Sequence, residues 1–191
     1  MGSEALPRAE RRAILDGRAL PENDQAKSAV APFASRWILR GGPEAAQPVA
    51  AAFGVAPPTA PMRAATEGAR AALWLGPDEW LLIAEEADAG LGAAIERALT
   101  GVAHALVDVS HRQCAIELSG PGAARLLNAG VPLDLDATAF PVGMAARTLF
   151  LKAEITLWRR EAERFRVEVA RSFAPYLVAA LAAAAREQAA G

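Results

Sequence analysis

The chain has 191 residues, 53% of them hydrophobic and 22% charged, with a formal net charge of -2 at pH 7. These values fit one compact globular unit with a sizeable core, and they exclude the basic surface typical of nucleic-acid binding. The single cysteine, Cys114, rules out an internal disulfide and a cysteine-based zinc site. We interpret it as a small buried hydrophobic residue on a strand.

Neither a targeting signal nor a membrane span is expected. Residues 1–30 lack the apolar core of a secretory signal, and the apolar run Leu177–Ala185 is too short to cross a membrane. We therefore expect a cytoplasmic protein. Residues 1–34 are a poor core former, so we expect an extended N-terminal arm that, if ordered, lies on a partner. One α+β domain is expected over residues 35–191.

From residue 35 onward, short apolar strands alternate with helical segments. The expected strands are Arg36–Arg40, Ala71–Leu75, Trp80–Ala84, Ala103–Val109, a strand with Cys114, Ile116 and Leu118 on one face, and Phe165–Ala170. The expected helices are one around Val49–Phe53, Ala89–Leu99, and Phe173–Gln188 capped by Ser172. Thr148–Leu151 and Ile155–Arg159 either pair across Lys152–Glu154 or form one continuous bent strand.

Two segments share the same layout of strand, short charged turn, strand and helix. Both carry a Leu-Trp pair before the turn, Leu73-Trp74 in one and Leu157-Trp158 in the other. A pseudo-repeat with halves of about 35–109 and 110–191 explains this layout, and so does convergence of two hairpin–helix units. Either alternative predicts an α+β fold with antiparallel or mixed sheets and helices packed on one side.

The stretch VDVSHRQCAIELSGPGAARLLNAGVPLD contains a strand, a charged turn, a second strand and a short helix. Ser119 is expected to be the N-cap of that helix, with Pro121 in its first turn and Gly130 closing it. The SGPG sequence lacks the spacing of a phosphate-binding loop, so capping explains it better.

Asp108 and His111 are the nearest approach to a catalytic cluster, because an Asp–His pair can position a base. We favour the alternative, in which Asp108 and Ser110 bind backbone donors of the turn while His111 and Arg112 are solvated or meet a partner. His104 lacks companions for a metal site. The tryptophans Trp74, Trp80 and Trp158 are expected in the core or an interface. We therefore predict no catalytic, cofactor-binding or metal-binding residues in this chain.

The strand–SGPGAARLL–helix unit resembles the folate-binding domain of the aminomethyltransferase family, the glycine-cleavage T-proteins. Four longer segments are similar to the gamma subunit family of heterotetrameric sarcosine oxidase: Trp74–Leu82, Asp108–Leu135, Phe140–Arg159 and Phe165–Leu181. The resemblance implies a T-protein-like folate-binding-domain fold, α+β, with two ferredoxin-like βαβ-type halves.

The resemblance also implies where the folate chemistry of T-proteins is missing. In T-proteins the segment matching Arg147–Arg159 carries a glycine pair and an aspartate that orients the folate. This chain has no glycine there, and only Glu154 stands near the acidic position. We expect Glu154 to form an ion pair with Lys152 in a hairpin.

The implied function is that of a non-catalytic gamma subunit with alpha, beta and delta partners. The complex oxidatively demethylates sarcosine to glycine, with hydrogen peroxide and formaldehyde or 5,10-methylenetetrahydrofolate as products. FAD, FMN, NAD and tetrahydrofolate are expected on the other subunits. The alternatives are a free-standing T-protein-like folate-binding protein or aminomethyltransferase, and the gamma subunit of a related N-methyl amino acid dehydrogenase.

Overall fold

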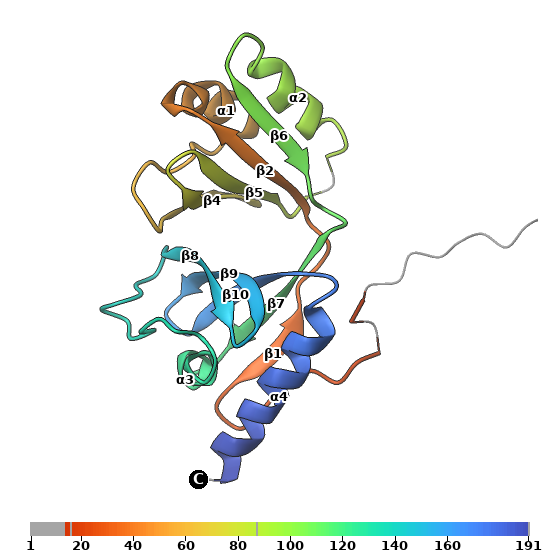
Figure 1. Cartoon of the computed structure of the whole chain (residues 1–191), viewed down its shortest axis with the longest axis vertical. Helices are drawn as coiled ribbons and strands as arrows, with labels where there is room; N and C mark the ends of the chain where they lie inside the picture. The colour runs from red at the N-terminus through yellow and green to blue at the C-terminus, as the bar shows by residue number, and fades with distance from the viewer. Residues whose placement is uncertain (1–13, 16, 87, 191) are drawn as a thin grey trace, which may run out of the picture.

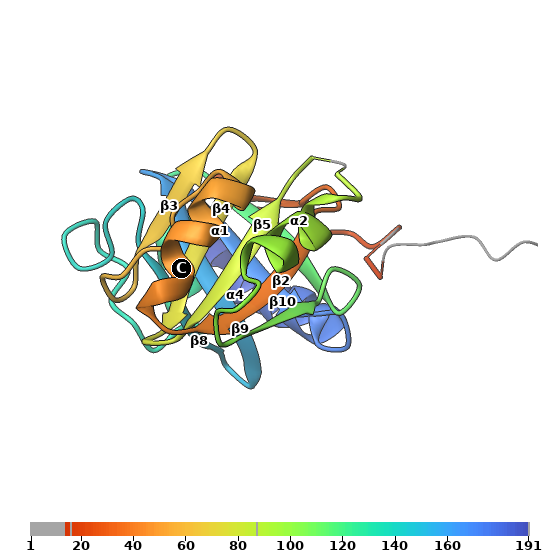
Figure 2. The same ribbon diagram turned by 90° about the horizontal axis from the view of Figure 1, so that it is seen from above.

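Two five-stranded sheets pack face to face, and helices cover the outer face of each, giving four layers (Figures 1 and 2). This computed structural model describes residues 14, 15, 17–86 and 88–190. None of the helices in these residues is long and apolar enough to cross a membrane.

The first sheet has the order β3-β4-β5-β2-β6, with all neighbouring strands antiparallel. Its strands are β2 (Ser35–Gly41), β3 (Ala64–Glu67), β4 (Arg70–Gly76), β5 (Glu79–Ala84) and β6 (His104–Asp108). Its outer face is covered by η1 (Pro43–Ala45), α1 (Ala46–Phe53) and α2 (Leu91–Ala98).

The second sheet has the order β1-β7-β10-β9-β8 and is also antiparallel throughout. Its strands are β1 (Lys27–Val30), β7 (Gln113–Ser119), β8 (Ala145–Phe150), β9 (Ala153–Glu161) and β10 (Arg164–Ala170). Its outer face packs on α3 (Ala123–Asn128) and α4 (Ala174–Ala190).

The two sheets have the same plan. The spatial order of the strands is equivalent in the two sheets: the first sheet runs β6-β2-β5-β4-β3, and the second runs β1-β7-β10-β9-β8. The sequence β2-α1-β4-β5-α2 likewise corresponds to β7-α3-β9-β10-α4, so the two Leu-Trp pairs lie on equivalent strands. In the first half β6 follows the second helix, as in a ferredoxin-like fold. In the second half the equivalent place is filled by β1, which comes from the N-terminal side of the chain.

Three apolar clusters account for the layers. One lies between the first sheet and its helices, around Phe53 and Ile95. The largest lies between the second sheet and α3 and α4, around Leu118 and Leu177. The smallest fills part of the space between the sheets, and its largest member is Trp158. Burial of these apolar side chains is the main force that holds the four layers together.

The α+β fold with two ferredoxin-like halves is confirmed, and every strand and helix expected after residue 35 is present within a few residues. Of the two alternatives for residues 148–159, the hairpin is correct, since β8 and β9 pair from Ala145↔Trp158 to Phe150↔Ala153. Two short strands, β1 and β3, were not expected. Residues 1–13 and 16 of the arm lie outside the described residues, but Lys27–Val30 pairs with β7 of its own chain.

The expected capping of α3 is wrong. Its N-cap is Gly122 without a side-chain hydrogen bond, so Ser119 ends β7 and Pro121 precedes the helix. The glycines serve packing instead. Gly120 has φ +115°, and a Cβ there would lie 2.5 Å from the carbonyl oxygen of Gln25. The backbone of the N-terminal segment crosses the loop at this point, and the N–H of Gly122 donates to that same oxygen at 2.8 Å.

Gly130 directly follows Ala129, the C-cap of α3, so the helix ends where expected, although the φ of Gly130 is not positive. A Cβ there would lie 2.9 Å from the ring of Phe150, so a close side-chain approach favours the glycine. The expected cap of α4 is wrong. Among the hydrogen bonds of the described residues, none joins the Ser172 hydroxyl to α4, whose first turn is closed by Leu177 N–H donating to the carbonyl of Phe173.

We predict that Gly120→Ala destabilises the chain by about 2–3 kcal/mol, because the new methyl group meets a backbone oxygen and the left-handed φ disfavours alanine. Gly101→Ala is the matched control, since Gly101 also has a positive φ (+83°) but nothing within 4 Å of a Cβ; its cost should be about 1 kcal/mol. Urea unfolding of the two variants measures the difference. Equal losses would show that the contact with Gln25 does not matter.

Candidate functional site

The Asp108–Arg112 turn satisfies its own backbone. The N–H of Ser110 donates to Asp108 Oδ1 at 2.8 Å, and the N–H of Arg36 donates to Ser110 Oγ at 2.9 Å. The favoured interpretation of Asp108 and Ser110 is therefore confirmed. No hydrogen bond or ion pair joins Asp108 to His111, and both His111 and Arg112 are exposed. The turn connects β6 of the first sheet to β7 of the second, and its Ser110 is bonded to β2.

His104 lies at the opposite end of β6 from this turn. Its Nδ1 is 2.8 Å from the carbonyl oxygen of Val102, and its Nε2 is 3.2 Å from Glu96 Oε1. Both ring nitrogens thus have protein partners. Across the described part of the chain, no group of three or more His, Cys, Asp or Glu side chains is arranged to hold a metal ion.

The hairpin of β8 and β9 is closed by protein contacts. The expected ion pair of Lys152 with Glu154 is absent, and both side chains are exposed at the turn, where an ion pair contributes little to stability. Leu151 takes the left-handed conformation of the turn with φ 52°. Arg147 donates instead to Glu79 of the first sheet at 2.5 Å. The hairpin is therefore tied to the neighbouring sheet.

The tryptophans lie in the core, as expected. Trp80 is buried and donates through Nε1 to the carbonyl oxygen of Pro58 at 2.8 Å. Trp158 is buried between the two sheets, with the guanidinium of Arg160 4.9 Å from its ring centroid. Trp74 is half-buried against the first core. None of the three forms an open stacking platform.

The main polar feature is a chain of ion pairs between the sheets, here called the inter-sheet network. It begins at Arg36 of β2, whose Nε donates to Glu168 of β10 at 2.7 Å and whose Nη1 donates to the carbonyl oxygen of Ala34. Both side chains are almost completely buried, 2% and 1% exposed. Glu168 also accepts from Nε of Arg166 at 2.7 Å, so one carboxylate serves two guanidinium groups.

The network continues across the second sheet to Glu85, which follows β5. Arg166 Nη1 donates to Glu85 at 2.5 Å and to Glu117 of β7 at 3.3 Å. Arg160 bonds the same two carboxylates, at 3.0 and 3.1 Å. Three arginines therefore meet three glutamates, and the charges balance. Each sheet supplies groups that the other neutralises.

Arg166 shows how this balance works. Burial lowers the pKa of a guanidinium, but Glu168, Glu85 and Glu117 together raise the pKa of Arg166 above its ordinary value. Two polar atoms in the network, Arg166 Nη2 and Glu117 Oε2, are buried without a protein partner. The arginine remains charged, and its charge is neutralised by carboxylates of the same chain.

The sequence pattern does not reveal this network. In β10, Arg166 and Glu168 alternate with apolar residues, and their side chains face the other sheet. The sequence does contain one indication that the first sheet is covered on both faces. In β5 five consecutive residues from Trp80 are buried, and an apolar run on both faces of a strand indicates that both faces of its sheet are covered. A second layer was therefore implied for the first sheet.

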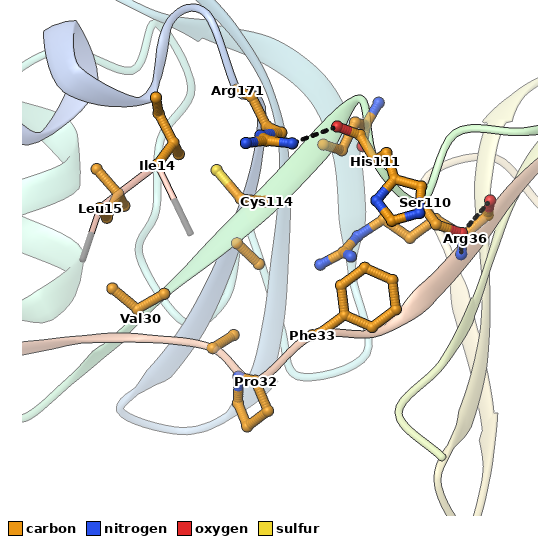
Figure 3. Close-up of a pocket in the computed structure, with 13 residues that line it drawn as sticks. Ile14, Leu15, Val30, Pro32, Phe33, Arg36, Ser110, His111, Cys114 and Arg171 are labelled. Atoms are coloured by element: carbon orange, nitrogen blue, oxygen red, sulfur yellow. Dashed lines mark hydrogen bonds between the residues drawn. The ribbon is translucent and has the colours of Figure 1, made fainter. Parts of the chain in front are cut away.

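A cavity of about 680 Å³ lies where the chain passes from β1 into β2, next to the turn that leads into β7. We call it the crossover cavity (Figure 3). Phe33, at its mouth, stacks on His111 with ring centroids 5.6 Å apart. Arg171 lies on the other side and donates to the carbonyl oxygen of His111 at 3.3 Å. Val30 and Cys114 contribute to the apolar wall.

Cys114 is only half-buried in that wall, whereas a buried residue was expected. Burial, with the nearby carboxylate of Glu168, raises the pKa of the thiol to about 11. The side chain therefore stays uncharged at neutral pH and is an apolar part of the cavity.

The fold is similar to that of a T-protein. The aminomethyltransferase T of the glycine cleavage system from Bartonella henselae superimposes with a TM-score of 0.61 over 82% of this chain and 45% of its own, at 15% identity. That similarity shows the fold alone.

A closer match identifies the family. The sarcosine oxidase gamma subunit family model matches residues 40–187, so the chain belongs to that family. The gamma subunit from an Arthrobacter species is 38% identical over 131 residues, 66% of this chain and 64% of that protein; the alignment thus spans under two thirds of the relative. A chain of the heterotetrameric sarcosine oxidase from Corynebacterium sp. U-96 superimposes with a TM-score of 0.86 at 30% identity, over 93% of this chain and 95% of that one.

We predict that Glu168→Gln lowers the free energy of unfolding by about 3–5 kcal/mol, because two buried guanidinium groups lose their shared counter-charge. The control is Asp78→Asn in the exposed pair with Arg40, where both side chains are 56% exposed; it should cost less than about 1 kcal/mol. Denaturant unfolding of both variants tests this. Similar small losses would mean that the inter-sheet network contributes little.

We also predict that Cys114 in the folded chain is alkylated by iodoacetamide at pH 9 more than about tenfold more slowly than in urea, because the pKa of about 11 leaves little thiolate. The rate should rise steeply as the pH approaches 11. Since the folded chain holds this proton more tightly than the unfolded chain, stability should fall as the pH rises from about 9 through about 11. Cys114→Ser gives the blank, and equal rates at pH 9 would contradict the prediction.

Proposed function

We propose that this chain is the gamma subunit of a heterotetrameric sarcosine oxidase and that its role is assembly, not catalysis. The observation that carries the proposal is the superposition, over nearly the whole of both chains, on a chain of an enzyme described as heterotetrameric sarcosine oxidase. Three relatives that are 36–38% identical in sequence are themselves named sarcosine oxidase gamma subunits.

The assembly role is supported by how the polar side chains are used. Asp108 and Ser110 hold backbone groups, and the buried glutamates are paired with arginines of the same chain. At the segment where T-proteins are expected to orient folate, Arg147 bonds Glu79, and Glu154 is exposed at the end of a closed hairpin. These groups stabilise the fold and are not poised for acid–base chemistry.

The proposal assigns the reaction to other chains. The complex would convert sarcosine to glycine, with hydrogen peroxide and formaldehyde or 5,10-methylenetetrahydrofolate as the other products. FAD, FMN, NAD and tetrahydrofolate would be held by the alpha, beta and delta subunits, in the cytoplasm. Because substrate selection belongs to those chains, the same role in a related N-methyl amino acid dehydrogenase is the alternative.

Co-expression tests this function. Co-expressed with flavin-bearing subunits of a sarcosine oxidase, the chain should co-purify in a stable complex, and omission of the chain should lower the yield of active complex several-fold. The chain purified alone should show no flavin absorbance. Sarcosine, N-methylglutamate and glycine compared as substrates of the complex separate the two alternatives.

Two outcomes would contradict the proposal. A complex that assembles and turns over equally well without this chain would remove the assembly role. Tight binding of tetrahydrofolate by the isolated chain in calorimetry would instead favour a folate-binding protein of the T-protein type.

A further inference from the structure

We propose that the crossover cavity receives an acidic segment of another subunit, with an apolar side chain of that segment beside Phe33 and a carboxylate against Arg171. This inference rests on the proposed function, because it requires that the chain assembles with partners. It adds to the proposed function the surface through which this chain binds a partner and the chemistry of the partner segment that binds there.

The apolar part of the argument is the exposure of large side chains around one hollow. Phe33 is 62% exposed, Val30 37% and Ile14 36%, and all three line the crossover cavity. Single exposed apolar residues are ordinary on protein surfaces, but several around one concave site are typical of interfaces. The ring of Phe33 is already held against His111, so burying it in a complex loses little conformational freedom.

The charge around the cavity selects the partner. Among the described residues, its lining includes Arg36, Arg171 and His111 but no aspartate or glutamate, although the chain as a whole carries a net charge of -2. Arg36 is neutralised by Glu168. Arg171 takes part in no ion pair among the described residues, and its hydrogen-bond partner there is a backbone carbonyl. A carboxylate from a partner would supply the missing counter-charge.

The shape favours a protein segment over a small molecule. Phe33 lines the cavity and is still 62% exposed, so a surface that extends over the mouth of the cavity would be needed to cover it. The cavity also adjoins β1, which is the edge strand of the second sheet. A sheet edge next to an apolar hollow is a surface on which extended protein segments dock.

A photo-crosslinker tests the proposal in the assembled complex. Phe33 is replaced by p-benzoylphenylalanine, the four chains are co-expressed, and crosslinked peptides are identified by mass spectrometry after irradiation. We expect a crosslink to another subunit, at a peptide with Asp or Glu within a few residues of the attachment point. The control places the same probe at Val142, which is 53% exposed and precedes β8 at the opposite edge of the second sheet; it should not label that peptide.

Charge reversal gives an independent measure. Arg171→Glu should weaken retention of the chain in the complex at least about tenfold at low salt, measured by dilution and size-exclusion chromatography. Arg125→Glu, an exposed position on α3, is the matched control and should have little effect. Circular dichroism of both full-length variants verifies that they are folded.

The outcomes separate this inference from the proposed function. If the unmodified chain fails to enter any complex, the proposed function fails. If the complex forms but the probe at residue 33 labels only this chain, including its residues 1–13, or a peptide without acidic residues, the docking inference alone is overturned. Equal retention of the two charge-reversal variants would overturn it as well.

Discussion

The contact on which the rest of the molecule depends is the buried ion pair between Arg36 and Glu168, because it is the most deeply buried of the ion pairs that join the two sheets across a small apolar cluster. A buried pair of this kind is costly to form and more costly to break, since either partner left alone is an unsolvated charge. A different packing of the two inner faces would leave one of these charges buried without its partner, so the pair specifies how the halves meet. The two ferredoxin-like halves must fold against each other, and the geometry of that contact is set by hydrogen bonds with defined directions.

The sequence was sufficient for elements whose apolar pattern is formed locally. The strands around Leu82 and Val167 and the helix ending in Phe53 each have a face that only a core can satisfy. Strands without such a face were missed: in β1, three of four residues are exposed, and pairing with β7 is what defines it. The inter-sheet network was missed for a related reason. Alternating charge on a strand indicates a polar face but does not show whether water or a second charged sheet lies against it.

The SGPG motif shows how a recognisable pattern can be correct for the fold and wrong in its local interpretation. It identifies the strand-to-helix connection of a T-protein-like half, but its glycines are needed because the backbone at Gln25 lies against them. That segment leads directly into β1, which completes the second sheet where β6 completes the first. The motif is thus explained by a long-range contact between the loop and the N-terminal segment, and a pattern of four residues cannot reveal its partner nearly a hundred positions away.

The same crossover links fold and proposed assembly. The segment that contains Phe33 is fixed at one end by the pairing of β1 with β7 and at the other by Arg36, which is bound to Glu168 and Ser110. A surface held at both ends is preorganised, so little binding energy is lost in ordering it when a partner docks. The arginines of the inter-sheet network are also no longer available to a ligand, since each is matched to a carboxylate of the same chain. A T-protein-like fold can in this way serve as a rigid support, with its buried charges stabilising the interior and its exposed aromatic and cationic groups left for contact with another protein.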